Sequence, residues 1–394
     1  MKDKIKQILT ECGAERATIT LILFLTILVG LIALIFGPKI DFSPDENRVL
    51  ESTPKISVDA LADGSFMDSV ENYIGDHFPL RKTFISLNTD VQLALGKRDI
   101  GSNYGKIPAE GGIYWGNQGH LYEVLLPNRT DTFTNNVKAI TEFGKNAGLP
   151  LTILPVPSGS QEQPNNLPLF APNHDQHEEL RAIQSAAKTG TTVVDLFDTL
   201  SAAKGDYYFK TDHHWNIYGA FEGYRALASA IGVKPLEKND FTFQTVSHEF
   251  YGTLYSKAIT FYPQADDFIL PICKKQSSIT QQTGKQIRTD LYWKQYLTQK
   301  DKYATFLGGN HSVDVVKNTA VQDDKRLLII KDSYANSLVP FLAQNFREIH
   351  IIDLRYYNQN IYQYIKQNKI TNLAAVYSIK QLCEVPVGNK LNMR

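Results

Sequence analysis

The sequence predicts an α/β protein in which a parallel β-sheet carries helices on both faces and follows one N-terminal transmembrane helix. Two observations lead to this prediction. An apolar segment near the N-terminus is long enough to cross a bilayer, and farther along the chain short apolar runs alternate with segments of helical periodicity. Of the 394 residues, 43% are hydrophobic, which suffices for a large buried core.

The apolar segment at residues 17–37 (ATITLILFLTILVGLIALIFG) contains no charged residue in 21 positions. A spanning helix needs about 20 such residues, whereas a cleavable signal peptide has an apolar core of about 7–15 and a cut site of small residues. A buried core helix is the other alternative. We expect an uncleaved anchor, because the cations of the preceding tail (residues 1–16) place that tail in the cytoplasm and the rest of the chain outside it.

The part of the chain after the anchor begins irregularly. Residues 38–57 contain prolines and charges without a period, which is typical of a linker. Apolar residues then recur at helical spacing from 58 to 97, and the glycine- and aromatic-rich stretch 99–124 favours β-hairpins. We expect residues 58–394 to form a single catalytic domain.

From residue 131 onward, helical and strand patterns alternate. The predicted helices are 131–148, 175–188, 217–231, 335–346 and 361–368, and the predicted strands are 151–156, 191–197, 326–330, 348–354 and 373–377. Strands that alternate with helices indicate a parallel sheet buried on both faces. The alternation stops between about 232 and 319, which we interpret as an insertion packed over the sheet edge.

Charge and cysteine content narrow the function. The chain has 41 basic and 41 acidic residues, without the basic excess of nucleic-acid-binding proteins, so no nucleic-acid partner is expected. Its three cysteines form neither a C-x-x-C pair nor a zinc-binding spacing, and no metal or cofactor is expected. Whether Cys273 and Cys383 pair is left open.

Ser333 follows the predicted strand 326–330 and precedes a predicted helix. This position is the carboxyl edge of a parallel sheet, where open α/β folds bind ligands, and the N–H groups of a helix N-terminus can stabilise an oxyanion. Taken alone, however, the turn fits a plain helix N-cap better.

The segment Asp212-His213-His214-Trp215 supplies a base. A serine is a weak nucleophile until a histidine takes its proton, and a carboxylate improves that histidine by fixing its tautomer. Asp212 can serve His214 in this way if the loop turns the two side chains together. The alternative is a metal site from Asp212, His213 and His214 with His311, which is disfavoured because adjacent histidines in extended chain point apart.

Three segments together carry a family resemblance. TDHHW (211–215), KDSYANS (331–337) and DLRYY (353–357) resemble the bacterial DHHW proteins, which are similar to SGNH-like alginate O-acetyltransferases and other polysaccharide O-acetyltransferases. ENYIGDHFPLR (71–81) and GGNH (308–311) extend the likeness to about residues 43–382. The resemblance implies an SGNH-hydrolase-like sheet. The aspartate and histidine precede the serine here, as in the permuted acetyltransferase branch, and Lys331 replaces the usual glycine before Asp-Ser.

The resemblance also implies residue roles. Ser333 matches the nucleophile, His214 the base and Asp212 its carboxylate. The residues implied in substrate binding or oxyanion stabilisation are Arg355, Asn310, Tyr334 and Trp215. Each has a structural alternative, which is a surface ion pair for Arg355, a turn for Asn310 and simple packing for the two aromatic residues. Asp76, His77 and Arg81 are expected to cap and pair helices.

The function implied is an O-acyltransferase, with acetyl as the expected group, that acts through a serine ester on hydroxyls of an extracytoplasmic or cell-envelope polysaccharide. Because no soluble acyl-CoA exists outside the cell, the resemblance also implies a membrane-bound O-acyltransferase partner as the acyl supplier. A polysaccharide acetylesterase with the same triad, and a non-catalytic polysaccharide-binding assembly protein, are the alternatives. The expected location is the cell membrane, with a single span and an extracytoplasmic catalytic domain.

Overall fold

The computed structural model describes residues 13–100, 111–125, 131–275 and 277–392, and the chain forms two compact units. The first unit runs to Leu95 and includes the later segment Ile259–Phe261. The second comprises Gly96–Ala258 and Tyr262–Arg394. The boundary after Leu95 means that the expected domain start at residue 58 falls inside the first unit. Most of the expected tail, residues 1–16, lies outside the described residues.

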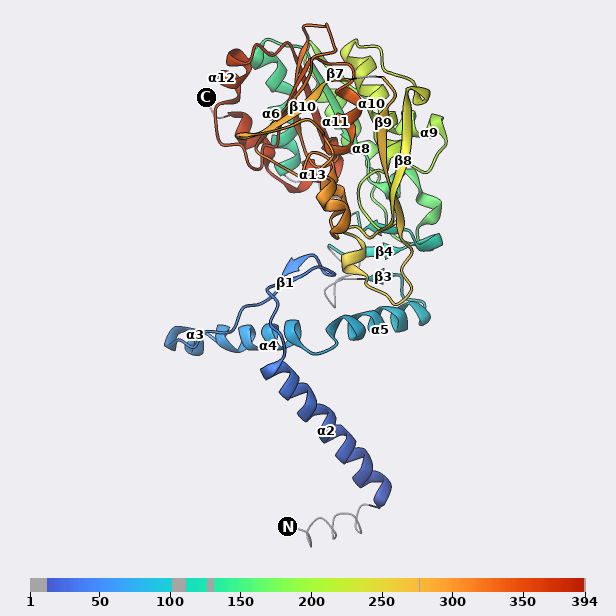
Figure 1. Ribbon diagram of the computed structural model, residues 1–394, viewed down its shortest axis with the longest axis vertical. Helices are drawn as coiled ribbons and strands as arrows, with labels where there is room; N and C mark the ends of the chain where they lie inside the picture. Colours follow the sequence, from blue (N-terminus) through green and yellow to red (C-terminus); the bar gives the residue numbers. More distant parts are fainter. Residues whose placement is uncertain (1–12, 101–110, 126–130, 276, 393–394) are drawn as a thin grey trace. The chain divides into compact units, whose positions relative to one another are not determined.

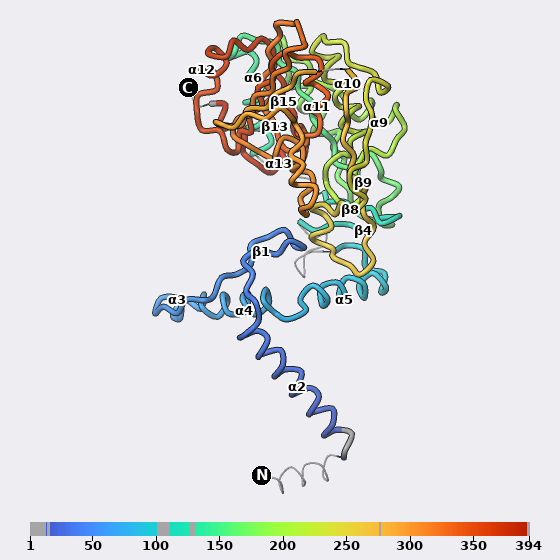
Figure 2. The backbone as a smooth tube through the Cα atoms, viewed as in Figure 1, coloured from blue at the N-terminus to red at the C-terminus, as the bar shows by residue number. Residues whose placement is uncertain are grey.

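The first unit begins with the apolar helix α2 (Ala14–Phe36), which is long and apolar enough to cross a membrane. A short antiparallel pair, β1 (Phe42–Ser43) and β2 (Arg48–Val49), follows within the segment predicted as a linker. The helical periodicity from residue 58 corresponds to three helices. These are α3 (Val58–Ala62), α4 (Ser65–His77) and α5 (Arg81–Ala94), drawn in blue to cyan along the trace (Figure 2).

The second unit is built on an eight-stranded sheet with the order β11-β10-β12-β14-β13-β15-β6-β7. The strands are β6 (Leu151–Val156), β7 (Thr191–Val193), β10 (Ile279–Thr283), β11 (Gln286–Arg288), β12 (Val313–Asn318), β13 (Arg326–Lys331), β14 (Glu348–Ile352) and β15 (Asn372–Ser378). The five strands from β14 to β7 are parallel, which confirms the predicted core of the sheet. The other three are antiparallel and come from the predicted insertion, which therefore extends the sheet instead of only covering its edge.

Helices cover both faces of the sheet (Figure 1). On one face lie α9 (Leu196–Ala203), α10 (Ile217–Ile231) and α11 (Ala335–Leu342), and on the other α6 (Asp131–Ala147), α8 (His177–Ala186), α12 (Ile361–Gln367) and α13 (Ile379–Glu384). Strand side chains alternate between faces, so Leu327 and Ile329 of β13 enter the first core and Leu328 and Ile330 the second. Burial on both sides explains why the central strands are continuously apolar.

Smaller elements complete the second unit. These are the antiparallel sheet of β3 (Asp99–Ile100), β4 (Ile113–Trp115) and β5 (Leu121–Glu123), the hairpin of β8 (Phe241–Phe250) and β9 (Asp266–Cys273), and the short helix α7 (Gly159–Glu162). The predicted strand 191–197 ends early, because Asp195 accepts a hydrogen bond from the Asp198 N–H and so begins α9. Cys273 and Cys383 are not joined by a disulfide.

Candidate active site

Ser333 lies in the turn between β13 and α11, at the carboxyl end of a central parallel strand. The Asp332 side chain holds this turn in place. It accepts hydrogen bonds from the backbone N–H groups of Tyr334, at 3.0 Å, and Ser378, at 2.7 Å. The Asp332 N–H also donates to the Val376 carbonyl, at 3.0 Å. These contacts fix the serine turn to the end of the neighbouring strand β15.

His214 lies beside Ser333, although the two are far apart in the sequence. Its Nε2 is 2.7 Å from Ser333 Oγ, and its Nδ1 is 2.5 Å from Asp212 Oδ1. The first distance falls within the range of about 2.6–3.2 Å expected of a nucleophile and its general base. The structure therefore joins the three residues into one hydrogen-bonded chain from carboxylate to serine.

The Asp212 carboxylate is buried, and both of its oxygens accept hydrogen bonds. Besides His214 Nδ1, Oδ1 accepts the His214 backbone N–H at 3.0 Å, while Oδ2 accepts the Thr253 N–H at 2.7 Å and hydroxyl at 3.0 Å. Burial alone would raise the pKa of Asp212. The charges of His214 and His213, together with these hydrogen bonds, outweigh that effect and hold the pKa well below its usual range. The ionised carboxylate favours a proton on His214 Nδ1, which leaves Nε2 free to accept one from Ser333.

The environment of His214 suits a general base. Burial, followed by the neighbouring His213, lowers the pKa of His214 to about 4, and Asp212 only partly opposes this. The ring stacks on the ring of Tyr303 with centroids 3.9 Å apart. At neutral pH the imidazole is therefore uncharged and held in a fixed orientation, ready to accept a proton.

Sequence reasoning missed three supporting residues, all in the stretch interpreted as an insertion. Thr253 binds Asp212, and the Tyr303 hydroxyl donates to the Ser333 carbonyl at 3.1 Å. Gly252 lets its backbone approach Asp212 so closely that a Cβ atom there would overlap the aspartate side chain. No periodicity or motif marks these positions in the sequence, so they can be identified only from the folded structure.

Lys331, the residue that replaces glycine, is buried behind the serine turn. Its ammonium donates to Asn310 Oδ1 at 2.6 Å and to Asn336 Oδ1 at 2.8 Å, and a carboxylate oxygen of Asp353 lies 3.7 Å away. Burial lowers the pKa of Lys331 to about 8, although the charge of Asp353 opposes this. Because the Asn310 oxygen faces Lys331, its amide N–H groups point away from the lysine.

Arg355 is fixed by the same carboxylate. Its Nε and one terminal nitrogen donate to the two Asp353 oxygens at 2.9 Å and 2.6 Å, and its side chain is 26% exposed. The ion-pair alternative for Arg355 is therefore present in the structure. Its guanidinium also lies close enough to Asp332 to act on the pKa of that carboxyl, which burial raises and the arginine charge lowers.

Trp215 and Tyr334 serve the architecture of the site. Trp215 is fully buried, and its Nε1 donates to the Tyr334 carbonyl at 3.1 Å and to Ser337 Oγ at 2.9 Å. Because the Trp215 ring has no exposed surface, its position fits the packing alternative and not stacking on a sugar. Tyr334 is also buried, and its hydroxyl donates to the His213 carbonyl, so it ties the serine turn to the segment that carries the base.

Asp212, His213 and His214 also form a group whose ligand atoms lie within 4.8 Å of one another, which is compact enough to hold a metal ion. In this arrangement, however, both ring nitrogens of His214 and both oxygens of Asp212 make hydrogen bonds that a metal would have to replace. His311, the fourth ligand considered, instead pairs with Asp314 at 3.0 Å. The residues present fit the hydrogen-bonded triad better than a metal centre.

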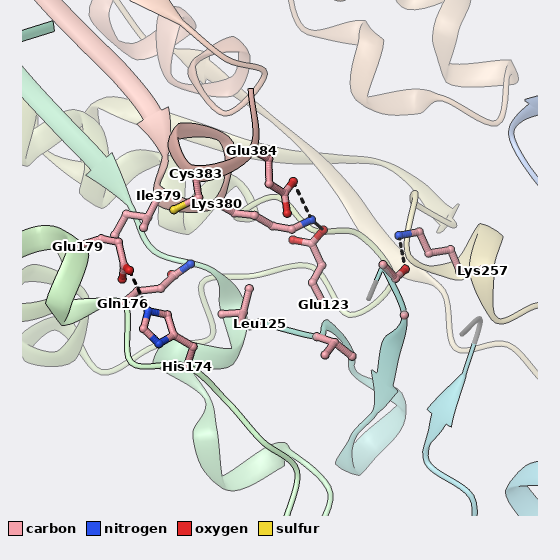
Figure 3. A pocket seen from close by; sticks show the side chains of 13 residues that line it. Glu123, Leu125, His174, Gln176, Glu179, Lys257, Ile379, Lys380, Cys383 and Glu384 are labelled. Carbon is pink, nitrogen blue, oxygen red and sulfur yellow. Dashed lines mark hydrogen bonds and ion pairs between the residues drawn. The ribbon is translucent and has the colours of Figure 1, made fainter. Parts of the chain in front are cut away.

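Figure 3 shows a cavity of the second unit, with a volume of about 280 Å³. Its wall includes Glu123, which also lines a smaller pocket together with Asp212. The Lys380 ammonium lies 2.6 Å from Glu123 and 3.5 Å from Glu384, and Lys257 donates to a backbone carbonyl at 3.0 Å. Small-molecule sites typically measure about 300–1,000 Å³. The cavity is thus close to the lower end of that range and offers both donors and acceptors to a hydroxylated ligand.

The fold and the site define an α/β protein with a hydrogen-bonded chain of serine, histidine and aspartate at the carboxyl edge of its sheet. Residues 176–352 match the family model described as DHHW protein. The resemblance predicted from TDHHW and KDSYANS is therefore confirmed. No curated protein sequence matches the chain.

Several solved structures are similar to this chain. A DHHW family protein from Eubacterium siraeum is 23% identical, with a TM-score of 0.59 over 71% of this chain and 94% of its own. PatB1 from Bacillus cereus, solved with a sulfonyl adduct, is 24% identical, with a TM-score of 0.59 over 70% and 97%. The O-acetyltransferase domain of Pseudomonas putida AlgJ is more distant, at 13% identity and a TM-score of 0.45 over 72% and 99%.

Proposed function

We propose that the protein is a serine O-acyltransferase that transfers an acetyl group to hydroxyls of a polysaccharide outside the cytoplasm. The observation that carries the proposal is the chain of hydrogen bonds from Asp212 through His214 to Ser333, with an uncharged base in its middle. The match to the DHHW family supports it. So does the sulfonyl adduct of PatB1, because sulfonyl reagents attach to activated nucleophiles.

In the first step, Ser333 Oγ attacks the carbonyl carbon of an acyl donor as His214 Nε2 takes the serine proton. The new C–O bond leaves a negative charge on the carbonyl oxygen, and the histidinium then protonates the leaving group as it departs. Ser333 is left as an ester. In the second step, a sugar hydroxyl gives its proton to His214 and attacks this ester, and the proton passes to Ser333 Oγ as the serine leaves.

The oxyanion of both steps needs donors beside Ser333. The first N–H groups of α11 lie in the same turn, and we assign the second donor to the amide of Asn310. Lys331 and Asn336 support this assignment, because they hold the Asn310 oxygen and so orient its N–H groups. Lys331 is a positioning residue in this scheme, and its charge adds to the positive potential behind the serine.

The supply of acyl groups is part of the proposal. We propose that α2 is an uncleaved anchor that leaves the second unit outside the cytoplasm, where acyl-CoA does not reach it. A membrane-bound O-acyltransferase would then deliver the acyl group across the bilayer, and the polysaccharide would be the final acceptor.

The full chain in detergent, supplied with a small acetyl ester and an oligosaccharide, tests the proposed function. A transferase should acetylate the sugar faster than it releases acetate, and Ser333→Ala should abolish both reactions. Ser229→Ala, at an exposed position of α10, is the matched control and should leave both rates unchanged. Acetate release that ignores the acceptor would instead make the protein an esterase, and sugar acetylation that survives Ser333→Ala would exclude the serine mechanism.

A further inference from the structure

Large apolar side chains lie exposed along α4, α5 and the turn between them. They are Met67, Ile74, Phe78, Leu80, Phe84, Leu87, Val91 and Leu95, with exposed fractions between 41% and 82%. On α5 they recur at steps of three and four residues, which places them on one face of the helix. We call this set the apolar stripe. An exposed apolar surface of this extent is typical of a site that contacts a membrane or another molecule.

In helix α5 the usual pattern of a soluble protein is reversed, because polar residues are buried and apolar residues are exposed. Ser86 and Thr89 are buried to 2% and 3% exposure, on the side opposite the stripe. On that side Asp90 accepts hydrogen bonds from the Thr260 hydroxyl and, at 3.2 Å, from the Phe261 N–H, both in the later segment of the same unit. The polar side of α5 therefore packs against protein, whereas its apolar side is left outward.

Contacts within the first unit place these helices next to the end of α2. Lys39 follows α2 by three residues, and its ammonium lies 5.3 Å from the centre of the Tyr73 ring in α4. Arg48 of β2 pairs with Asp76 near the end of α4. Through the Lys39 side chain, α4 is thus in contact with the segment that directly follows the helix that can span a membrane.

A second ion pair fixes the start of α5. Glu46, in the turn between β1 and β2, pairs with Arg81 at 2.8 Å and with Arg48 at 3.0 Å. Asp76 and Arg81, which were expected to cap and pair helices, both form ion pairs with the hairpin that follows α2. The junction of α4 and α5 is consequently held at the hairpin, close in sequence to the end of α2.

The net charge of the segment that contains α3, α4 and α5 shows whether electrostatic attraction or apolar burial would drive its binding to a membrane. Residues 58–95 contain six acidic and two basic residues, a net charge of −4. Attraction to anionic lipid headgroups therefore cannot drive binding, and burial of the apolar stripe must do so.

We propose that α4 and α5 lie on the outer surface of the lipid bilayer, with the apolar stripe buried at the boundary between headgroups and acyl chains. The first unit is then a membrane-surface platform that follows the anchor. This inference concerns the first unit and does not depend on the proposed reaction of the second. Lipid is favoured over a protein partner because the stripe belongs to helices tied directly to the end of the spanning segment.

Photo-cross-linking of the full chain in phosphatidylcholine vesicles tests the proposal. Benzoylphenylalanine would replace Phe84 in the stripe, Lys82 on the opposite side of α5 as the matched control, or Phe24 within α2 as the reference for lipid contact. Mass spectrometry after illumination should find lipid adducts at positions 84 and 24, and at least several-fold fewer at 82. Lipid adducts at 24 but not at 84, or at neither, would overturn the proposal.

The same experiment distinguishes other occupants of the stripe. A cross-link from position 84 to a second copy of the chain, without lipid adducts, would make the stripe a dimer interface and overturn the proposal. Yields at position 84 should not rise when phosphatidylglycerol is added and should not fall in high salt, because the segment is acidic. A yield that needs anionic lipid and collapses in salt would contradict the apolar mechanism.

Discussion

The Asp212→Asn change tests how the site works, because the structure specifies what the new amide would meet. Of the two carboxylate oxygens, Oδ1 accepts the His214 ring and backbone N–H groups, and Oδ2 accepts the Thr253 N–H and hydroxyl. Asparagine keeps only one oxygen. Whichever way the amide turns, its NH₂ group faces a backbone N–H, so one buried donor loses its acceptor.

Two magnitudes follow from this geometry. A buried donor left without an acceptor costs about 1–3 kcal/mol, and we expect the free energy of unfolding to fall by that amount. The effect on catalysis should be larger. An amide NH₂ that faces His214 Nδ1 favours the tautomer with its proton on Nε2, which cannot accept the Ser333 proton, and the loss should be about ten-thousand-fold.

Denaturant unfolding and the rate of Ser333 acylation by a small acetyl ester measure the two effects separately. Thr253→Val is the matched control, because it removes the hydroxyl contacts to Asp212 Oδ2 and His213 Nδ1 but keeps the backbone N–H that binds Oδ2. It should reduce the acylation rate much less than Asp212→Asn does. An Asp212→Asn enzyme that acylates within tenfold of the unaltered rate would refute the assigned role of the carboxylate.

Three further outcomes are expected. The pKa of His214 in the folded protein is about 4, below its ordinary value of 6.5. In a pH–rate curve, acylation should therefore stay level above about pH 5 and fall as the pH drops through 4. In pH-dependent unfolding, the stability contributed by neutral His214 should be complete above pH 6.5 and decline below it, because the unfolded chain binds the proton first. Lys331→Met should lower kcat by up to the 10²–10³-fold typical of a lost oxyanion donor. In a double-mutant cycle it should add little to the effect of Asn310→Ala, whereas fully additive effects would show that Lys331 does not act through Asn310. Trp215→Ala should destabilise the protein by about 3–5 kcal/mol in urea unfolding. If the variant still folds, its KM for the acceptor should be unchanged, whereas a raised KM would indicate that Trp215 contacts the substrate.

The sequence allowed the core of the site to be predicted because its chemistry is local. TDHHW holds the base two residues from its carboxylate, and a serine directly after a buried strand must lie at the carboxyl edge of the sheet. Together with the resemblance to the DHHW proteins, this led to the prediction that Ser333 Oγ lies close to His214 Nε2.

The supporting contacts could not be predicted because they depend on how irregular segments return to the site. Thr253 and Tyr303 reach it from a stretch without periodicity, and which residues such a stretch presents is decided by tertiary packing. Trp215 shows the same limit. Its position beside His214 fits a cleft or a core equally well in sequence, and the approach of α11 determines that it is buried.

The fold shows a similar division. Continuous apolar runs such as 326–330 identified the central parallel strands, because burial on both faces leaves a composition that a local window detects. The antiparallel strand β12, which lies between β10 and β14, alternates between buried and less buried positions and was missed. The separate first unit was also missed, since helical periodicity at 58–97 does not indicate which body the helices join.

Intact-mass analysis of the full chain after reaction with a small acetyl ester tests the serine mechanism most directly. The proposed function predicts a single added acetyl group that peptide mapping places on Ser333, that is absent from Ser333→Ala, and that disappears when an oligosaccharide acceptor is added and becomes acetylated. Acetyl on a different residue, or sugar acetylation by a chain whose Ser333 never carries acetyl, would contradict it.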